Sequence, residues 1–188
     1  MKKPILLALP LALALAAAAQ AATITEEEVA IQYNYGEMFA NVANQEFKLV
    51  LRGNPFGADP AQFERGIVAQ VQKNMPVPTT VTPRPAITDR RPDYRLVLLF
   101  NPAGGVPNWR LCDNLDNQPS TLPTAPGHVE VAAAYCRNEV ALTSARARTD
   151  ARGPDDPAIN SLFSQLLPVL FPRVDPIRPQ QRPNRPFR

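Results

Sequence analysis

Two stretches of the chain have apolar patterns that predict β-strands, the first alternating and the second a continuous run. In EFKLVLRGN, residues 46–54, the side chains of Phe47, Leu49 and Leu51 share one side of an extended backbone, which is typical of a half-buried strand. YRLVLLFN, residues 94–101, is apolar on both sides, so we place this strand in the centre of a sheet.

A helical spacing of apolar residues follows two Asp-Pro pairs. Asp59 and Asp156 are suited to be N-caps, and the proline after each fits the first position of a helix. The apolar face is predicted to hold Phe63, Ile67, Val68 and Val71 in the first helix, and Ile159, Leu162, Phe163, Leu166 and Leu167 in the second. Pro168 is expected to end or kink the second helix.

Three other segments have weaker patterns. Residues 128–148 are predicted to form two strands that meet at a tight turn at Arg137-Asn138, with one long bent strand as the alternative. An edge strand is predicted at 79–82, and NWRLCD, residues 108–113, is interpreted as a short strand.

The segment 24–45 is ambiguous. Thr25 followed by Glu28 resembles a capping box and favours a short helix, whereas Tyr33 and Tyr35 favour a strand. The pattern does not decide between the two.

The order of these elements favours helices packed on one face of an antiparallel sheet. We therefore predict an α+β fold: a small, mainly antiparallel sheet with two helices packed on one face, long Pro-rich loops and a disordered C-terminal tail. Residues 22–171 are predicted to form a single α+β domain, and the Arg/Pro-rich residues 172–188 to be disordered.

The N-terminus has the pattern of a secretory signal peptide over residues 1–21. Lys2 and Lys3 precede an apolar run, and Ala19-Gln20-Ala21 fits the cleavage rule, so the mature chain is expected to begin at Ala22. No second long apolar run follows, so no transmembrane span is predicted after cleavage; an uncleaved membrane anchor is the alternative. The expected location is periplasmic or secreted, in bacteria.

The distribution of charge argues against nucleic-acid binding. The whole chain has 20 basic and 17 acidic residues, but two lysines lie in the signal and five arginines lie in residues 173–188. Between these ends, 13 basic residues face 16 acidic ones. A nucleic-acid-binding domain is expected to carry its basic surface on the folded part of the chain.

Cys112 and Cys136 are the two cysteines of the chain. A pair of cysteines in an exported protein predicts a disulfide, which would destabilise the unfolded chain by about 3.5 kcal/mol in the loop-entropy treatment. A reactive thiol or a metal ligand is the competing interpretation, but no Cys-x-x-Cys pair accompanies these residues.

His128 is the single histidine, so any catalytic triad would have to use it. No serine lies in a Gly-x-Ser-x-Gly pattern, and no spacing of His, Cys and acidic residues matches a metal site. We expect no catalytic site, no cofactor and no metal.

Asn101, Pro102 and Gly105 follow the central strand in a pattern that resembles the Asn-Pro-x-x-Gly opening of diacylglycerol kinases. That resemblance implies a nucleotide site, but the Gly-Gly-Asp-Gly-Thr segment of the family is absent. We interpret the segment as a turn, in which the glycines allow positive φ, that brings Cys112 back toward Cys136.

Two groups of arginines are candidates for binding. Arg146, Arg148 and Arg152 could bind an anionic group, although such residues often form only a solvated strand face. In the tail, the candidates are Arg178, Arg182 and Arg185, whose partners could be an envelope protein or an anionic surface such as peptidoglycan or lipid.

These features predict an exported bacterial envelope protein without an evident catalytic site, acting as a binding or assembly module. One alternative is a secreted hydrolase that uses His128 or a pair of carboxylates. Another is a periplasmic carrier of a small ligand, with an apolar cavity between the sheet and Phe163 and Leu167.

Overall fold

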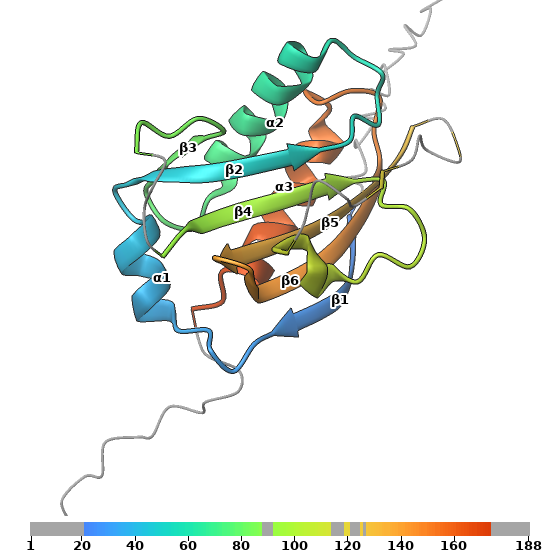
Figure 1. The fold of residues 1–188 in the computed structure, drawn as a ribbon. Coiled ribbons are helices and arrows are strands. Elements are labelled where there is room, and N and C mark those ends of the chain that lie inside the picture. The colour runs from blue at the N-terminus through green and yellow to red at the C-terminus, as the bar shows by residue number, and fades with distance from the viewer. Residues whose placement is uncertain (1–20, 88–91, 114–118, 121–124, 126, 174–188) are drawn as a thin grey trace, which may run out of the picture.

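The fold is taken from a computed structural model that describes residues 21–87, 92–113, 119–120, 125 and 127–173. Six strands form one sheet in the order β1-β6-β5-β4-β2-β3 (Figure 1). In chain order their bounds are β1 Thr23–Val29, β2 Glu46–Arg52, β3 Thr80–Thr82, β4 Tyr94–Phe100, β5 His128–Arg137 and β6 Val140–Asp150.

The prediction of a small, mainly antiparallel sheet with two helices is wrong. The sheet is mixed: β1, β6, β5 and β4 pair antiparallel, whereas β2 pairs parallel to both β4 and β3. Parallel neighbours need a crossover connection, and α2, Pro60–Asn74, supplies it between β2 and β3. The described residues also hold a third α-helix, α1, Tyr35–Val42. The fold is still of the α+β class.

The ambiguous segment 24–45 contains both a strand and a helix. Its helix starts at Asn34, whose side chain accepts a hydrogen bond from the Glu37 amide (3.0 Å), and not at Thr25. Thr25 lies in β1, where one extra residue separates it from Glu28 relative to the facing strand β6. This β-bulge hides the period of two, which explains why alternation did not identify the strand.

Both predicted Asp-Pro helix starts are confirmed. Asp59 accepts a hydrogen bond from the Gln62 amide (2.9 Å) at the start of α2. Asp156 accepts one from the Ala158 amide (2.9 Å) at the start of α3, Pro157–Leu170, which includes Pro168 near its end. The predicted hairpin is also confirmed: β5 and β6 meet at Asn138, which has a φ of 52°.

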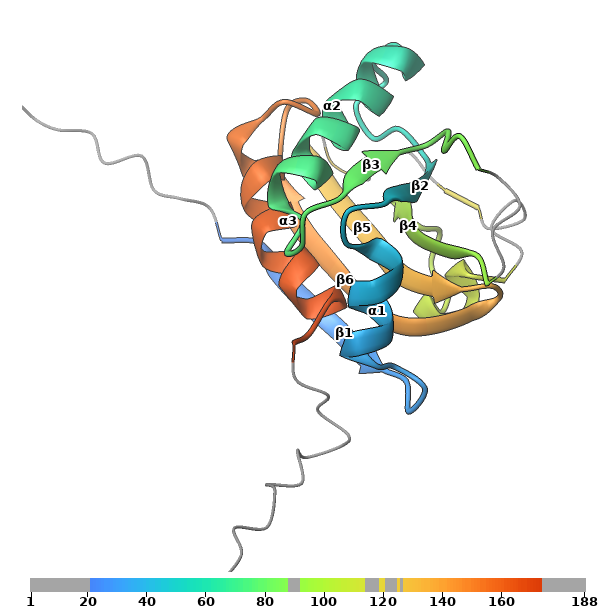
Figure 2. The ribbon, with the colours of Figure 1, turned by 90° about the vertical axis from the view of Figure 1, so that its left-hand side faces the viewer.

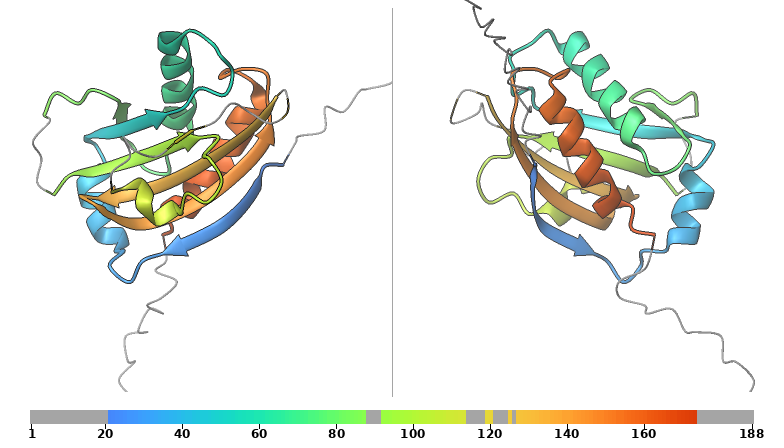
Figure 3. Two further views of the ribbon diagram at one scale, coloured as in Figure 1. Left: turned by 45° about the vertical axis from the view of Figure 1, so that its right-hand side comes forward. Right: turned by 180° about the vertical axis from the view of Figure 1, so that it is seen from behind.

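Helices α2 and α3 lie side by side on one face of the sheet, and α1 lies at one end of it (Figures 2 and 3). We call this face the helix face. Its core contains buried apolar residues from every layer, among them Met38, Phe47, Ile67, Leu96, Leu98, Phe100, Tyr135, Leu162, Phe163, Leu167 and Phe171.

The opposite face carries a smaller core, and we call it the loop face. The segment after β4 folds over it, and its buried residues are Val97, Leu99, Val106, Leu111, Cys112, Ala132, Ala134 and Cys136. Residues Asn108–Leu111 form a 3-10 helix, η1, so the interpretation of NWRLCD as a short strand is wrong. Alternating residues of β4 serve the two faces, which confirms its predicted place inside the sheet.

Candidate functional site

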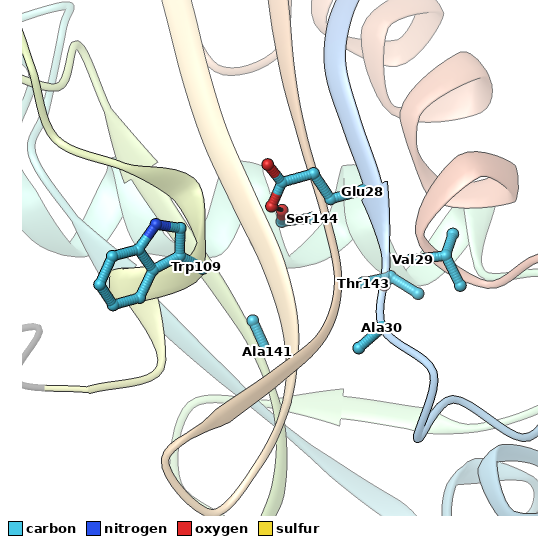
Figure 4. Close-up of a pocket in the computed structure, with 7 residues that line it drawn as sticks. All are labelled: Glu28, Val29, Ala30, Trp109, Ala141, Thr143 and Ser144. Atoms are coloured by element: carbon cyan, nitrogen blue, oxygen red, sulfur yellow. Dashed lines mark hydrogen bonds between the residues drawn. The ribbon is translucent and has the colours of Figure 1, made fainter.

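A groove on the loop face separates η1 from β1, and we call it the β1–η1 groove. Its volume is about 450 Å³, and its lining is Glu28, Val29, Ala30, Trp109, Ala141, Thr143 and Ser144. Trp109 stands on one side, and the carboxylate of Glu28 turns toward Ser144 on the other (Figure 4). The small side chains of Ala141 and Ser144 leave the space between them open.

The bulge in β1 places Glu28 in the groove. Thr25 stands opposite Arg146 and Glu28 stands opposite Ser144, so both point to the loop face although they are three residues apart. Glu26 lies inside the bulge with a φ of 53°, in the left-handed region. Bulges commonly redirect side chains in this way next to binding sites.

Trp109 is 52 % exposed, which is unusual for a large aromatic side chain with buried neighbours. Asn108 and Leu111, in the same short helix, are buried and fix its position. The Arg110 guanidinium lies 5.0 Å from the centroid of the Trp109 ring, a cation–π contact that restricts the ring further. The groove therefore has an aromatic wall that needs little reordering on binding.

Arg146 of β6 holds η1 against the sheet. Its guanidinium donates to Asn108 Oδ1 (3.0 Å) and to the Val106 carbonyl. Both acceptors belong to the segment after β4 that folds over the loop face, which we call the covering segment. It also donates to Glu130 Oε1 (2.8 Å), and its Nε lies 2.7 Å from a carboxylate oxygen of Glu26. A buried arginine with this many acceptors is a structural anchor for the wall of the groove.

The carboxylate of Glu130 is shared between two arginines. It accepts from Arg146 and, through its second oxygen, from Arg148 Nε (3.0 Å). Burial alone would raise the pKa of Glu130, but the hydrogen bonds from Arg146 and Arg148 outweigh it and leave that pKa below the usual value.

The three arginines predicted to bind an anion are not brought together. Arg146 and Arg148 share Glu130, whereas Arg152 lies in the loop between β6 and α3, where its backbone amide donates to Asp156 (3.0 Å). Anion binding by this group stays a prediction. The tail candidates Arg178, Arg182 and Arg185 lie outside the described residues.

The predicted disulfide between Cys112 and Cys136 is confirmed, with a Cα–Cα distance of 5.6 Å. It joins the end of η1 to the end of β5, and Arg95 donates to the Cys112 carbonyl (2.7 Å) beside it. The covering segment is thus held at one end by a covalent bond and in its middle by Arg146.

The turn predicted after β4 is formed by Asn101 and Gly105, which have φ values of 46° and 85°. Asn101 Oδ1 accepts from the Glu130 amide (2.9 Å), so the side chain fastens the turn to β5. The segment makes a connection across the loop face, as the interpretation as a turn requires.

His128 lies at the start of β5, in a second groove of about 440 Å³ lined by Ala21, Thr23, His128, Arg148, Thr149 and Asp150. Its Nδ1 is 3.2 Å from Asp150 Oδ1. Among the described residues, the hydroxyl groups in this lining are those of Thr23 and Thr149, and a catalytic role for His128 stays a prediction.

A further polar cluster joins α1 to the sheet and was not predicted. Glu37 accepts from the Tyr94 hydroxyl and from Arg137 (2.9 Å). The Tyr94 hydrogen bond lowers the pKa of Glu37, while burial and the nearby carboxylate raise that of Tyr94 to about 12. Because these groups satisfy one another, we assign the cluster to the attachment of α1.

Two negative findings apply to the described part of the chain. It holds no group of three or more His, Cys, Asp or Glu side chains placed to bind a metal. None of its helices combines the length and apolar character needed to cross a bilayer.

Comparisons of the chain with protein-family models, with curated proteins and with solved structures gave no match. The evidence that bears on function is therefore the geometry of the β1–η1 groove. The sequence did not single out the residues of this groove as a site: Glu28 entered only through its capping-box pattern with Thr25, in a segment left undecided between helix and strand. The half-exposure of Trp109, in a short helix whose Asn108 and Leu111 are buried, is a signal that only the structure provides.

Proposed function

We propose that this protein is an exported bacterial envelope protein that acts by binding, as a module for recognition or assembly, and that the β1–η1 groove is its binding surface. The observation that carries the proposal is the half-exposed Trp109, held on an anchored segment opposite the carboxylate of Glu28. Tryptophan is enriched among the residues that dominate binding energy, especially where its position is already fixed.

The chemistry of the groove favours a protein segment with a basic side chain as its ligand. Glu28 is exposed and accepts a hydrogen bond from the Ser144 hydroxyl (3.5 Å), whereas Glu26 and Glu130 are engaged by Arg146. An aromatic wall and an available carboxylate suit a cation. The small side chains of Ala141 and Ser144 between them suit an extended peptide backbone.

Export and the absence of nucleic acid among the partners rest on the sequence. The described residues begin at Ala21 and β1 begins at Thr23, so cleavage before Ala22 would leave the sheet intact. The disulfide is of the kind that forms in an oxidising compartment. The acidic balance of the domain supports a protein partner over a nucleic acid.

The test is site-specific photo-crosslinking in intact envelopes. A photoreactive phenylalanine replaces Trp109 in one variant and Ile87 in another, because Ile87 is also 52 % exposed but lies outside the groove. We expect a discrete crosslinked protein from position 109 and none from position 87. A second substitution, Glu28→Gln, should weaken the crosslink from position 109. Equal crosslinking from both positions, or from neither, would contradict the proposal.

A further inference from the structure

The β1–η1 groove lies beside the point where the C-terminal tail leaves the domain. Thr143, which contributes to the groove, donates from its hydroxyl to the Leu170 carbonyl in the last turn of α3 (2.6 Å). The Tyr33 hydroxyl donates to the Pro172 carbonyl (2.7 Å), a few residues after the end of β1. The start of the tail is therefore held next to the end of β1, on the other side of the sheet edge (Figure 3).

Residues 174–188 have the composition that suits the groove. Four arginines and one aspartate give this segment a positive charge, and four prolines alternate with the arginines along it. Pro-rich segments favour the polyproline II conformation and dock on aromatic-lined grooves at a low entropic cost. Among the described residues, Glu28 has no ion-pair partner, so a tail arginine would find an available carboxylate there.

The tail is also long enough to reach. At about 3.1 Å per residue in polyproline II, the nine residues from Val174 to Arg182 extend about 28 Å. A segment tethered so close to its site has an effective concentration on the order of millimolar. A contact too weak to persist between separate molecules would thus still be occupied within one molecule.

We propose that residues 174–188 turn around the end of β1 and dock in the β1–η1 groove, with an arginine against Glu28 and a proline against Trp109. This inference concerns an occupant from the same chain. It holds whether or not an external partner binds the groove, and an external basic segment would have to displace the tail.

The test uses the fact that Trp109 is the only tryptophan of the chain. Its fluorescence and its quenching by acrylamide report directly on the groove. We compare the full mature chain with a full-length variant that carries Arg178→Gln, Arg182→Gln and Arg185→Gln. We expect quenching of the parent to be roughly twofold weaker, because docked residues exclude water from the ring. The difference should disappear near 1 M salt, where the Debye length is about 3 Å.

A second experiment supplies the tail as a separate peptide. A chain that ends at Arg173 keeps Phe171 in the core and the Pro172 carbonyl that Tyr33 binds. We titrate it with a synthetic peptide of residues 174–188 and follow the Trp109 emission. Glu28→Gln should weaken binding roughly threefold, as expected for loss of one exposed ion pair. Glu64→Gln, on α2 and paired with Arg84, should leave it unchanged.

Equal quenching in the parent and the triple variant would overturn the proposal, as would a Trp109 signal that does not respond to the peptide. Equal weakening by Glu28→Gln and Glu64→Gln would also overturn it, because the tail would then bind by net charge and not in the groove. None of these results would affect the detection of an envelope partner crosslinked at position 109. Failure of the tail docking is therefore distinguishable from failure of the proposed function.

Discussion

The two faces of the sheet are covered by different means. On the helix face, α2 and α3 bury large aromatic and aliphatic side chains, including Phe47, Phe100 and Phe163. On the loop face, the core consists mainly of valine, leucine, alanine and the disulfide, and a segment with one short 3-10 helix covers it. Hydrophobic packing closes one face, whereas a covalent bond and a buried arginine hold the cover on the other.

This difference explains where the groove lies. On the helix face, large side chains pack against one another at the density usual for protein interiors. The loop face is covered only over β4, β5 and part of β6, so the β1–η1 groove forms between the covering segment and β1, with small residues of β6 in its lining. A polar anchor positions Trp109 without filling the space beside it. The larger core and the groove proposed for binding therefore lie on opposite faces of one sheet.

The largest expected effect is on the helix face. Phe163→Ala removes a fully buried ring from α3 and should lower the free energy of unfolding by about 4 kcal/mol. Chemical denaturation measures this loss. The emission maximum of Trp109 should not change, because this residue lies in the groove on the opposite face of the sheet. A shift in emission would show that the two faces are not independent.

Loss of the disulfide should come next. A Cys112→Ser, Cys136→Ser variant removes a crosslink between residues 24 apart in sequence and should lose about 3.5 kcal/mol. In contrast to the change in α3, it should also increase the mobility of Trp109, which fluorescence anisotropy measures. Unchanged anisotropy would mean that Arg146 alone holds the covering segment in place.

The arginine anchor gives a smaller effect with a matched control. Arg146→Leu leaves acceptors on Glu130, Asn108 and Val106 without their donor and should cost about 2 kcal/mol. Arg148→Leu removes only the half-exposed partner of Glu130 and should cost less than about 1 kcal/mol. Anisotropy of Trp109 should fall in the first variant and not in the second. The opposite order would contradict the assignment of Arg146 as the anchor.

Acid should weaken both faces, through one carboxylate on each. The Tyr94 hydroxyl lowers the pKa of Glu37, and for Glu130 the arginine hydrogen bonds lower the pKa despite burial. A carboxyl with a lower pKa in the folded state adds stability above its unfolded pKa and loses it as the pH falls through the folded value. The free energy of unfolding should thus decline below about pH 4.5, the ordinary value for both groups.

Denaturation curves of Glu37→Gln and Glu130→Gln across this pH range test the assignment. Each variant should be less stable than the parent at neutral pH and show a shallower decline in acid. If the free energy of unfolding of a variant declines as steeply as that of the parent, the substituted carboxylate does not contribute to the acid sensitivity.

The smallest effect is expected at Tyr135, on the helix face. Its hydroxyl is fully buried and has no hydrogen-bond partner among the described residues, and burial raises its pKa strongly. Tyr135→Phe should therefore leave stability within about 1 kcal/mol of the parent or raise it slightly. A larger loss in thermal denaturation would reveal a partner for this hydroxyl.

The helix face was largely predictable from the sequence, and the loop face was not. Both Asp-Pro helix starts, the apolar stripe of α3 and the strand Tyr94–Phe100 follow from local spacing, because each large side chain repeats with the period of its element. The parallel pairing of β2 depends instead on the path of α2 across the sheet, which no local pattern encodes.

The groove depends on two features that spacing conceals. The bulge shifts Glu28 out of the alternation of β1, and η1 has too few residues to show any period. The disulfide was predictable from the count of cysteines and their expected compartment. The ion pair between Arg146 and Glu130 was not, because it joins two strands whose register the sequence does not fix.

The pairing of β1 with β6 also determines when the groove can exist during folding. Thr23 pairs with Arg148, so the first strand of the sheet needs one of the last segments of the domain to be present. Contacts between such distant segments form slowly, because a long loop has to close before they are made. The wall that contains Trp109 further requires the middle of the chain. The groove is therefore a property of the finished fold, and a partner that recognises it would select completed molecules over folding intermediates.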